Sequence, residues 1–419
     1  MKPHDLNKPV LGIDQLSDET SLIHDSRKGV TAIREGKNID LDAEGNVSRR
    51  KGYTLKLAGA TYHSLYESAR GWLMACKGEE LGVYTPETNV FAVITTMASN
   101  YLTSFTELNG NIYFMNPGHK GMIRVDEAKA RPLGETLPDA IPDFAVATSG
   151  SLPAGRYGIT YSVVNNVGEE SPLGPLMVVT LNERGGVQGT LFTVAAGYKY
   201  RIYMTTVDGT ELYQAAEFDA NVTSFLISNH EVGRRPITQY LTYLPFGYTI
   251  CAHGSRLYVA TTDFVFFSEA FMPHLTNPAH GFLPTVGFTT MLQPVEGGIF
   301  IGDQTGVKFY KGEDPLVFEP KDVSTEVPVF GTSIAVPGSF LPEEYASADV
   351  SAIWLSESGY HIGLPTGEVV RLHSRQVRLP RYVQGCTALS VKDGRKQLIT
   401  PVNSNVLADA SVALDSTIS

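Results

Sequence analysis

Carboxylates in two short turns are the first residues of this sequence that suggest chemistry. One turn is Asp303, Gln304, Thr305 and Gly306, and the other spans residues 357–359. Two carboxylates could form a glycosidase pair, whose separation would decide the stereochemistry of the reaction. Aspartate in a strand-connecting turn more often caps the backbone through an Asx hydrogen bond, and we favour this interpretation. Because the sequence also lacks hydrolase-elbow, Walker A and GxGxxG motifs, we predict no enzymatic activity.

Histidine and cysteine give little support for a metal or cofactor site. His274 and His280 are the nearest histidine pair and lie in a stretch rich in proline and glycine, but a metal site would need a third ligand nearby. The cysteines Cys76, Cys251 and Cys386 are far apart, each in or beside an apolar run, without a CxxC motif. We predict that all three are small buried hydrophobic residues, and we expect no metal and no cofactor.

Basic residues gather in two places. A compact run at residues 49–51 fits a solvated hairpin end, or a contact to an acidic neighbouring subunit or to DNA in a lumen. The second cluster, which also includes Arg371, is loose and interrupted by Pro380. Arginine suits pairing with carboxylates across a subunit boundary. The candidate interface or channel-rim residues are therefore Arg49, Arg50, Lys51, Arg375, Arg378 and Arg381.

The overall charge argues against a conventional nucleic-acid-binding protein. The 419 residues carry a formal net charge of −11, without the global basic footprint of such proteins. An acidic protein faces DNA better as a repulsive channel wall than as a binding site. The first residues lack the apolar core of a signal peptide, and no 18-residue apolar stretch occurs. We therefore expect synthesis in the cytoplasm and no membrane span.

A recurring pattern of strand and turn indicates the elements that hold these residues. An apolar run ends in a short turn with glycine or asparagine, and a second apolar run follows, as in 101–108 and 111–115 or in 248–252 and 256–261. Such a repeated antiparallel unit is typical of a β-propeller. Five units are visible, and the hairpin 387–402 could pair with 39–41 or 47–55 to close the ring, giving about six blades.

The pattern changes at the linker 137–142, which contains two prolines. Residues 143–245 hold about seven alternating strands with turns every 8–12 residues, which favours an inserted β-sandwich of the fibronectin or immunoglobulin type. We therefore predict an all-β protein. Its predicted parts are a docking arm (1–30), the first part of the propeller (31–137), the sandwich (143–245), the second part of the propeller (246–402) and a tail (403–419).

Four phrases, in this order, resemble the tail nozzle or hub proteins of short-tailed bacteriophages and related head-to-tail and packaged-DNA-stabilising proteins. Residues 38–53 (NIDLDAEGNVSRRKGY) are similar to the opening of these proteins, which ends in two arginines and a Gly-Tyr pair. Residues 155–172, followed by 200–205, resemble their fibronectin-like insert. The other two phrases are 252–269 and 294–312.

The resemblance implies a structural protein of the virion tail. It implies a ring of identical subunits, six in number, that continues the DNA channel, holds the packaged DNA and lets it leave on infection. The implied partners are adaptor or portal-side tail proteins, tail fibres, and DNA that passes the lumen without sequence-specific binding. The alternative from a different class is a carbohydrate-binding or glycan-degrading propeller, an adhesin or depolymerase. Such an enzyme would turn over glycan, whereas a ring protein would co-purify with virions.

Overall fold

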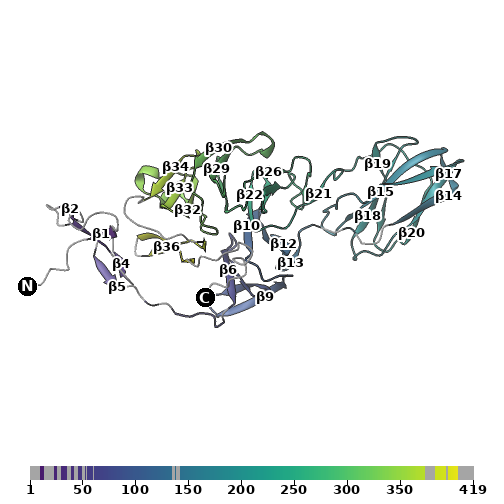
Figure 1. The fold of residues 1–419 in the computed structure, drawn as a ribbon. Coiled ribbons are helices and arrows are strands. Elements are labelled where there is room, and N and C mark those ends of the chain that lie inside the picture. Colours follow the sequence, from purple (N-terminus) through teal and green to yellow (C-terminus); the bar gives the residue numbers. More distant parts are fainter. Residues whose placement is uncertain are drawn as a thin grey trace, which may run out of the picture.

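The computed structural model describes residues 10–13, 23–25, 30–34, 39–41, 46–49, 52, 54–59, 61–134, 137, 142–372, 383–392 and 395–403. The chain forms short, mainly antiparallel strands in an elongated arrangement (Figure 1). A group of four-stranded sheets lies in the middle of the view, the sandwich strands lie at one end, and β1–β5 lie at the other. The protein is all-β, a propeller-like body with an inserted β-sandwich, as the sequence predicts.

Five four-stranded antiparallel sheets make up the propeller body, each with its strands in chain order. The first two precede the sandwich and are β6 (Tyr62–Glu67), β7 (Leu73–Lys77), β8 (Glu80–Thr85) and β9 (Val90–Thr96), then β10 (Ser104–Leu108), β11 (Asn111–Asn116), β12 (His119–Ile123) and β13 (Ala130–Pro132). The third contains β22 (Thr249–His253), β23 (Arg256–Ala260), β24 (Phe264–Phe267) and β26 (Phe282–Pro284). The fourth contains β27 (Met291–Val295), β28 (Gly298–Asp303), β29 (Gly306–Lys311) and β30 (Glu319–Ser324), and the fifth β31 (Ile334–Pro337), β32 (Val350–Ser356), β33 (Gly359–Gly363) and β34 (Val369–Leu372).

Tight turns set the register of these sheets. Asn109 and Gly110, between β10 and β11, have φ of 52° and 76°, and Gly254 and Ser255, between β22 and β23, have φ of 52° and 61°. Two consecutive residues with positive φ are the mark of a type I′ hairpin turn, whose twist matches that of the strands. In the part of the chain that the structure describes, three short 3-10 helices lie in the longer connections: η2 (Pro315–Val317), η3 (Gly338–Phe340) and η4 (Glu343–Tyr345).

The hydrophobic core runs from sheet to sheet. The first strands of neighbouring sheets contact one another, β10 with β22, β22 with β27, and β27 with β31. Four buried clusters take side chains from two adjacent four-stranded sheets, for example Ile112 with Met74, and Phe300 with Trp354. A single sheet could not bury its own face, so the repeated units stabilise one another.

A two-stranded sheet follows the fifth four-stranded sheet. It consists of β36 (Ala388–Lys392) and β37 (Arg395–Ile399), and its Leu389 and Leu398 pack against the core of the fifth sheet. β35 (Gln384–Gly385) and β38 (Val402–Asn403) pair beside it. The sequence suggested that this hairpin pairs with 39–41 or 47–55. Within the described residues it does not, because β4 (Ile39–Leu41) and β5 (Val47–Arg49) pair with each other instead.

The sandwich consists of two sheets that enclose a core of their own. One has the order β14-β17-β20, and the other β16-β15-β18-β19. Its strands are β14 (Asp143–Leu152), β15 (Gly155–Val164), β16 (Met177–Leu181), β17 (Gly185–Thr190), β18 (Lys199–Thr205), β19 (Leu212–Asp219) and β20 (Ser224–Ile227). Tyr161, Val187 and Ile202 are buried between the sheets.

Two further small sheets complete the described strands. β21 (Thr242–Tyr243) returns from the sandwich and pairs with β25 (Leu275–Thr276) of the propeller body. At the N-terminal end, β3 (Val30–Ile33) lies between β1 (Val10–Ile13) and β2 (Ile23–Asp25). Within the residues that the structure describes, no helix is long and apolar enough to cross a membrane.

Candidate functional site

The acidic turn at Asp303 has a structural role. Its carboxylate accepts hydrogen bonds from the backbone N–H of Thr305 at 2.7 Å, from the Thr305 hydroxyl at 2.6 Å and from the N–H of Val286 at 3.1 Å. Burial alone would raise the pKa of Asp303, but these hydrogen bonds hold it below its ordinary value. The Asx-cap interpretation is confirmed.

The second acidic turn leads to a network that the sequence did not reveal. Ser358 donates its N–H at 3.1 Å and its hydroxyl at 2.6 Å to Glu326, which also accepts from Arg371 at 2.9 Å. The buried His361 lies 3.7 Å from the same carboxylate and stacks on Trp354. Burial lowers the pKa of His361. Burial would raise the pKa of Glu326, but the Ser358 hydrogen bonds, His361 and Arg371 hold it below its ordinary value.

This network does not have the geometry of nucleophilic catalysis. A serine nucleophile donates to a histidine base, which a third group then orients. Here Ser358 donates to Glu326 directly, and His361 approaches the same carboxylate oxygen. The three groups therefore tie the connection after β30 to the β32–β33 turn. No short-range pattern marks Glu326, because it is 32 residues from Ser358 in sequence.

Histidines and cysteines are dispersed in the described part of the chain, where no group of three or more potential metal ligands occurs. His274 is buried and His280 is exposed. Cys76 and Cys251 are buried, as predicted, and burial raises their thiol pKa to about 11 and about 12. The prediction for Cys386 is wrong, since it is exposed just before β36, where a short connecting segment leaves it uncovered.

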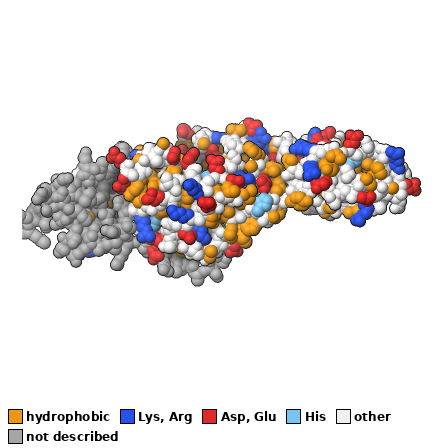
Figure 2. Space-filling view, turned by 90° about the horizontal axis from the view of Figure 1, so that it is seen from above, with side chains coloured by type: hydrophobic (Ala, Val, Ile, Leu, Met, Phe, Trp, Pro, Cys, Tyr) orange, Lys and Arg blue, Asp and Glu red, His pale blue; other side chains and the backbone are white. Residues whose placement is uncertain are grey.

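Of the six candidate interface residues, the structure describes Arg49, which is exposed in β5. The other five, Arg50, Lys51, Arg375, Arg378 and Arg381, lie outside the described residues. The visible face in Figure 2 shows acidic, basic and hydrophobic side chains interspersed over the propeller body and the sandwich.

A buried residue of the sandwich, Glu170, lies at the junction with the propeller body. Glu170 accepts hydrogen bonds from Ser162 and Tyr203 at 2.6 Å and from Arg201 at 2.7 Å. Its backbone carbonyl accepts a hydrogen bond from His274 Nε2 of the propeller body at 2.9 Å. A buried carboxylate needs partners for its charge, and these three donors supply them. The hydrogen bonds therefore hold the sandwich turn that meets the propeller body.

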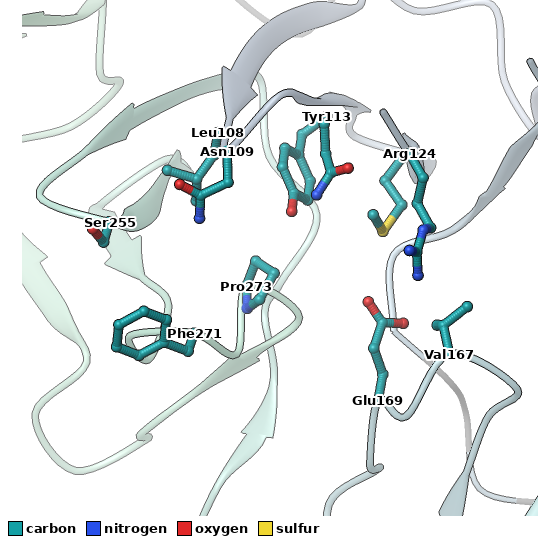
Figure 3. A pocket seen from close by; sticks show the side chains of 11 residues that line it. Leu108, Asn109, Tyr113, Arg124, Val167, Glu169, Ser255, Phe271 and Pro273 are labelled. Atoms are coloured by element: carbon teal, nitrogen blue, oxygen red, sulfur yellow. The ribbon is translucent and has the colours of Figure 1, made fainter. Parts of the chain in front are cut away.

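A polar cleft of about 270 Å³ opens beside this contact (Figure 3). Its walls are the tips of two propeller hairpins, the sandwich turn with Glu169, and the loop 271–273. The Tyr113 hydroxyl and the Glu169 carboxylate extend toward the same space from the propeller and the sandwich respectively. The cleft is lined by Leu108, Asn109, Asn111, Tyr113, Met122, Arg124, Val167, Glu169, Ser255, Phe271 and Pro273.

Phe271 at the edge of the cleft is unusual. Its side chain is 86% exposed, and its φ of 62° lies in the left-handed region that phenylalanine rarely adopts. An exposed aromatic ring in a strained backbone conformation is a feature found at binding surfaces. No sequence signal indicated this cleft, since its walls come from four separate segments.

No protein-family model and no curated protein matches this chain. Among solved structures, it is similar to the N-terminal domain of Nup159, with 9% identity and a TM-score of 0.30 over 80% of this chain and 71% of that one. It is also similar to the extracellular domain of the putative one component system BT4673 from B. thetaiotaomicron, with 11% identity and a TM-score of 0.30 over 87% and 48%. A third match is PorZ of Porphyromonas gingivalis, with 11% identity and a TM-score of 0.21 over 86% and 55%. TM-scores of this size do not bear on what the chain binds or does.

Proposed function

We propose that this chain is a structural subunit of a bacteriophage tail, which forms a ring of about six copies and continues the DNA channel as a nozzle or hub. The observation that carries the proposal is the combination of a propeller body and an inserted sandwich with the four ordered phrases that resemble such proteins. The phrase 38–53 contains β4 and β5, and the phrase 155–172 contains β15 and the junction residue Glu170. The phrase 252–269 contains β23 and β24, and the phrase 294–312 contains β28 and β29.

The charge of the chain supports this role. DNA leaves a particle fastest through a tube that does not bind it, because each lysine or arginine contact with a phosphate adds affinity through counterion release. A subunit with a net charge of −11 and few basic clusters suits such a tube. We expect acidic or neutral side chains at the narrowest part, and the basic residues 49–51 at an interface or rim.

In this proposal the ring lies in the virion tail between adaptor or portal-side proteins and the tail tip, and tail fibres contact it from outside. The sandwich projects from the propeller body and presents two sheets for such contacts. The Glu170 network orders the sandwich turn whose backbone carbonyl accepts a hydrogen bond from His274 of the body.

Cryo-electron microscopy of purified particles, combined with sedimentation of the isolated protein, tests this function. We expect a closed ring on the tail axis, with the propeller bodies around the channel. The variant Cys386→Ser serves as a control against adventitious disulfide-linked oligomers, because Cys386 is exposed. A lumen densely lined by lysine and arginine, or a position on a fibre away from the axis, would refute the channel.

The alternative, a carbohydrate-binding propeller, has one observation in its favour, the polar cleft with the exposed ring of Phe271. Sugars bind to sites that combine an aromatic face with a few polar groups. The lining includes a single carboxylate, Glu169, whereas glycoside hydrolysis usually needs two. A glycan array tests this alternative. Binding of a glycan that is lost in Phe271→Ala would support it, and the absence of any binding would exclude it.

A further inference from the structure

A serine, a histidine and an asparagine form a connected chain of hydrogen bonds in the first four-stranded sheet. His63 and Ser64 belong to β6, and Asn100 precedes β10. Ser64 Oγ lies 2.8 Å from His63 Nδ1, and His63 Nε2 lies 3.0 Å from Asn100 Oδ1. Nε2 is also 3.1 Å from the carbonyl oxygen of Gly78. His63 and Ser64 are half-buried and Asn100 is exposed, so the group reaches the surface of the described structure.

The carbonyl of Gly78 fixes the direction of these hydrogen bonds. A carbonyl can only accept, so Nε2 carries the hydrogen, and Nδ1 of the neutral ring is then an acceptor. Ser64 therefore donates its hydroxyl hydrogen to Nδ1, while its oxygen accepts the backbone N–H of Thr103 at 2.8 Å. A serine nucleophile needs this direction toward its base, whereas Ser358 donates to a carboxylate.

The backbone of β6 departs from regular strand geometry at this point. Consecutive side chains of a regular strand point to opposite faces, so neighbours in sequence do not meet. Ser64 has a φ of 55°, and the pairing of β6 with β7 shifts its register between His63 and Tyr66. A bulge of this kind redirects a side chain, and a left-handed backbone at a residue other than glycine costs energy. The irregularity therefore turns Ser64 toward His63 at the expense of backbone strain.

We propose that Ser64 is the nucleophile of a site that hydrolyses small, activated carboxylic esters. His63 is its general base, and Asn100 and the Gly78 carbonyl orient the ring; some hydrolases use an asparagine as this third group. The Thr103 N–H stabilises the negative charge on Oγ as the hydroxyl proton leaves. Because Ser64 and His63 are half-buried, the site favours small acyl groups. The inference goes beyond the proposed tail function and does not depend on it.

The reaction has two steps. In the first, Ser64 Oγ attacks the carbonyl carbon of the ester while its proton moves to His63 Nδ1. The Oγ–carbon bond forms, the bond from that carbon to the alcohol oxygen breaks, and the leaving oxygen takes the proton from His63. In the second step, water attacks the acyl-serine through the same proton transfers and releases the carboxylic acid. Both side chains return to their starting state, and water is the only co-reactant.

This arrangement has no local sequence motif. Our prediction of no enzymatic activity was based on the absence of such motifs. Asn100 is 37 positions from His63, and Gly78 is 15 positions from it. The packing of these segments in the first sheet brings the groups together, so the site is visible only in the structure.

Two probes on the full chain test the site. The protein should hydrolyse p-nitrophenyl acetate, with an acetyl group on Ser64 in the quenched reaction, and a fluorophosphonate should stop hydrolysis by labelling the same residue. Ser64→Ala should abolish both reactions. His63→Gln should lower the rate of labelling roughly a hundredfold, the usual contribution of a general base. Ser358→Ala is the matched control, because Ser358 lies near a histidine but donates to a carboxylate, and it should react as wild type.

Asn100 is a positioning residue, and its variants test that role separately. Asn100→Asp keeps an oxygen that accepts a hydrogen bond from Nε2, so it should retain activity. Asn100→Leu should lower kcat several-fold and leave KM unchanged, because the ring loses its orientation while the substrate loses no contact. Equal losses in the two variants would contradict the positioning role.

The remaining outcomes decide the proposal. Absence of labelling in the folded wild type, labelling spread over several serines, or labelling that survives His63→Gln would overturn it. Acetylation of Ser64 without continued release of nitrophenolate would overturn the hydrolytic step and leave the nucleophile standing. Circular dichroism checks that each variant is folded. If His63→Gln does not fold, wild type in acid gives the same comparison, because a protonated imidazole cannot accept the Ser64 proton and labelling should cease.

Discussion

His274 Nε2 lies 2.9 Å from the carbonyl oxygen of Glu170, and this buried hydrogen bond joins the propeller body to the sandwich. The carbonyl can only accept, so Nε2 carries the hydrogen and His274 is the donor. On the sandwich side, the Glu170 side chain is tied to Ser162, Arg201 and Tyr203. One donor from a loop of the propeller body therefore contributes to the contact with the sandwich.

Replacing His274 by alanine should loosen the junction. The change leaves a buried carbonyl without its donor and creates a cavity, which costs roughly 1–3 kcal/mol. Amide hydrogen exchange should rise in the turn 165–171 and around β25, while the sandwich core stays protected. The exposed His280→Ala is the matched control and should behave as wild type. Unchanged exchange in His274→Ala would mean that other contacts hold the two parts together.

The strands of both parts could be predicted from the sequence, because alternation and turn residues are local signals. The turn at Asn109-Gly110 shows why, since both residue types already favour positive φ. The bridge between Phe330 and Gln384 could not be predicted in the same way, because strand neighbours in a propeller are set by packing between distant segments.

The candidate sites show the same limit. Asp303 caps its own turn, so its role depends on neighbours two residues away and could be predicted. The Glu326 carboxylate accepts a hydrogen bond from Ser358 and lies beside His361 and Arg371. These three residues are more than 30 positions away in the sequence, so no local pattern predicts the contact. His274 lies in a stretch that reads as an ordinary loop, and its burial depends on where the sandwich turn meets the propeller. Contacts of this kind depend on how distant segments pack, so they could not be predicted from the sequence.

Removing the sandwich should leave the propeller body folded when the deletion respects β21. Replacing residues 143–236 by a short Gly/Ser linker keeps the pairing of Tyr243 with Leu275 and the buried Leu244. Circular dichroism should show a cooperative β-sheet unfolding transition. A longer deletion of 143–245 removes that strand and the core residue, so its melting temperature should be lower by several degrees. Loss of all folded protein in the shorter deletion would mean that the two parts share one core.

Phe271→Asn should stabilise the isolated chain. Asparagine tolerates the left-handed region better than phenylalanine, and the 86% exposed ring loses little packing. We expect a gain of about 0.5 kcal/mol in the free energy of unfolding, measured by urea denaturation. The control is Phe267→Asn, at a buried position of β24, which should lose about 3 kcal/mol. A clear loss of stability in Phe271→Asn would show that the ring packs against the protein in solution.

Lys120 should make the stability of the propeller body rise with pH in the alkaline range. Its ammonium donates to the Leu244 carbonyl and lies over the rings of Tyr243 and Phe246, and burial lowers its pKa to about 8. Between pH 8 and the ordinary lysine pKa near 10.5, the unfolded chain binds more protons than the folded chain, so stability increases with pH.

Above pH 10 the buried tyrosines act in the opposite direction, because burial raises the pKa of Tyr203 and Tyr258 and the folded chain then retains protons. From pH 8 to pH 10, wild type should gain roughly 1–2 kcal/mol relative to Lys120→Met in urea unfolding. Lys77→Met, at an exposed lysine, should follow wild type, and parallel curves for wild type and Lys120→Met would show that the ammonium is solvated.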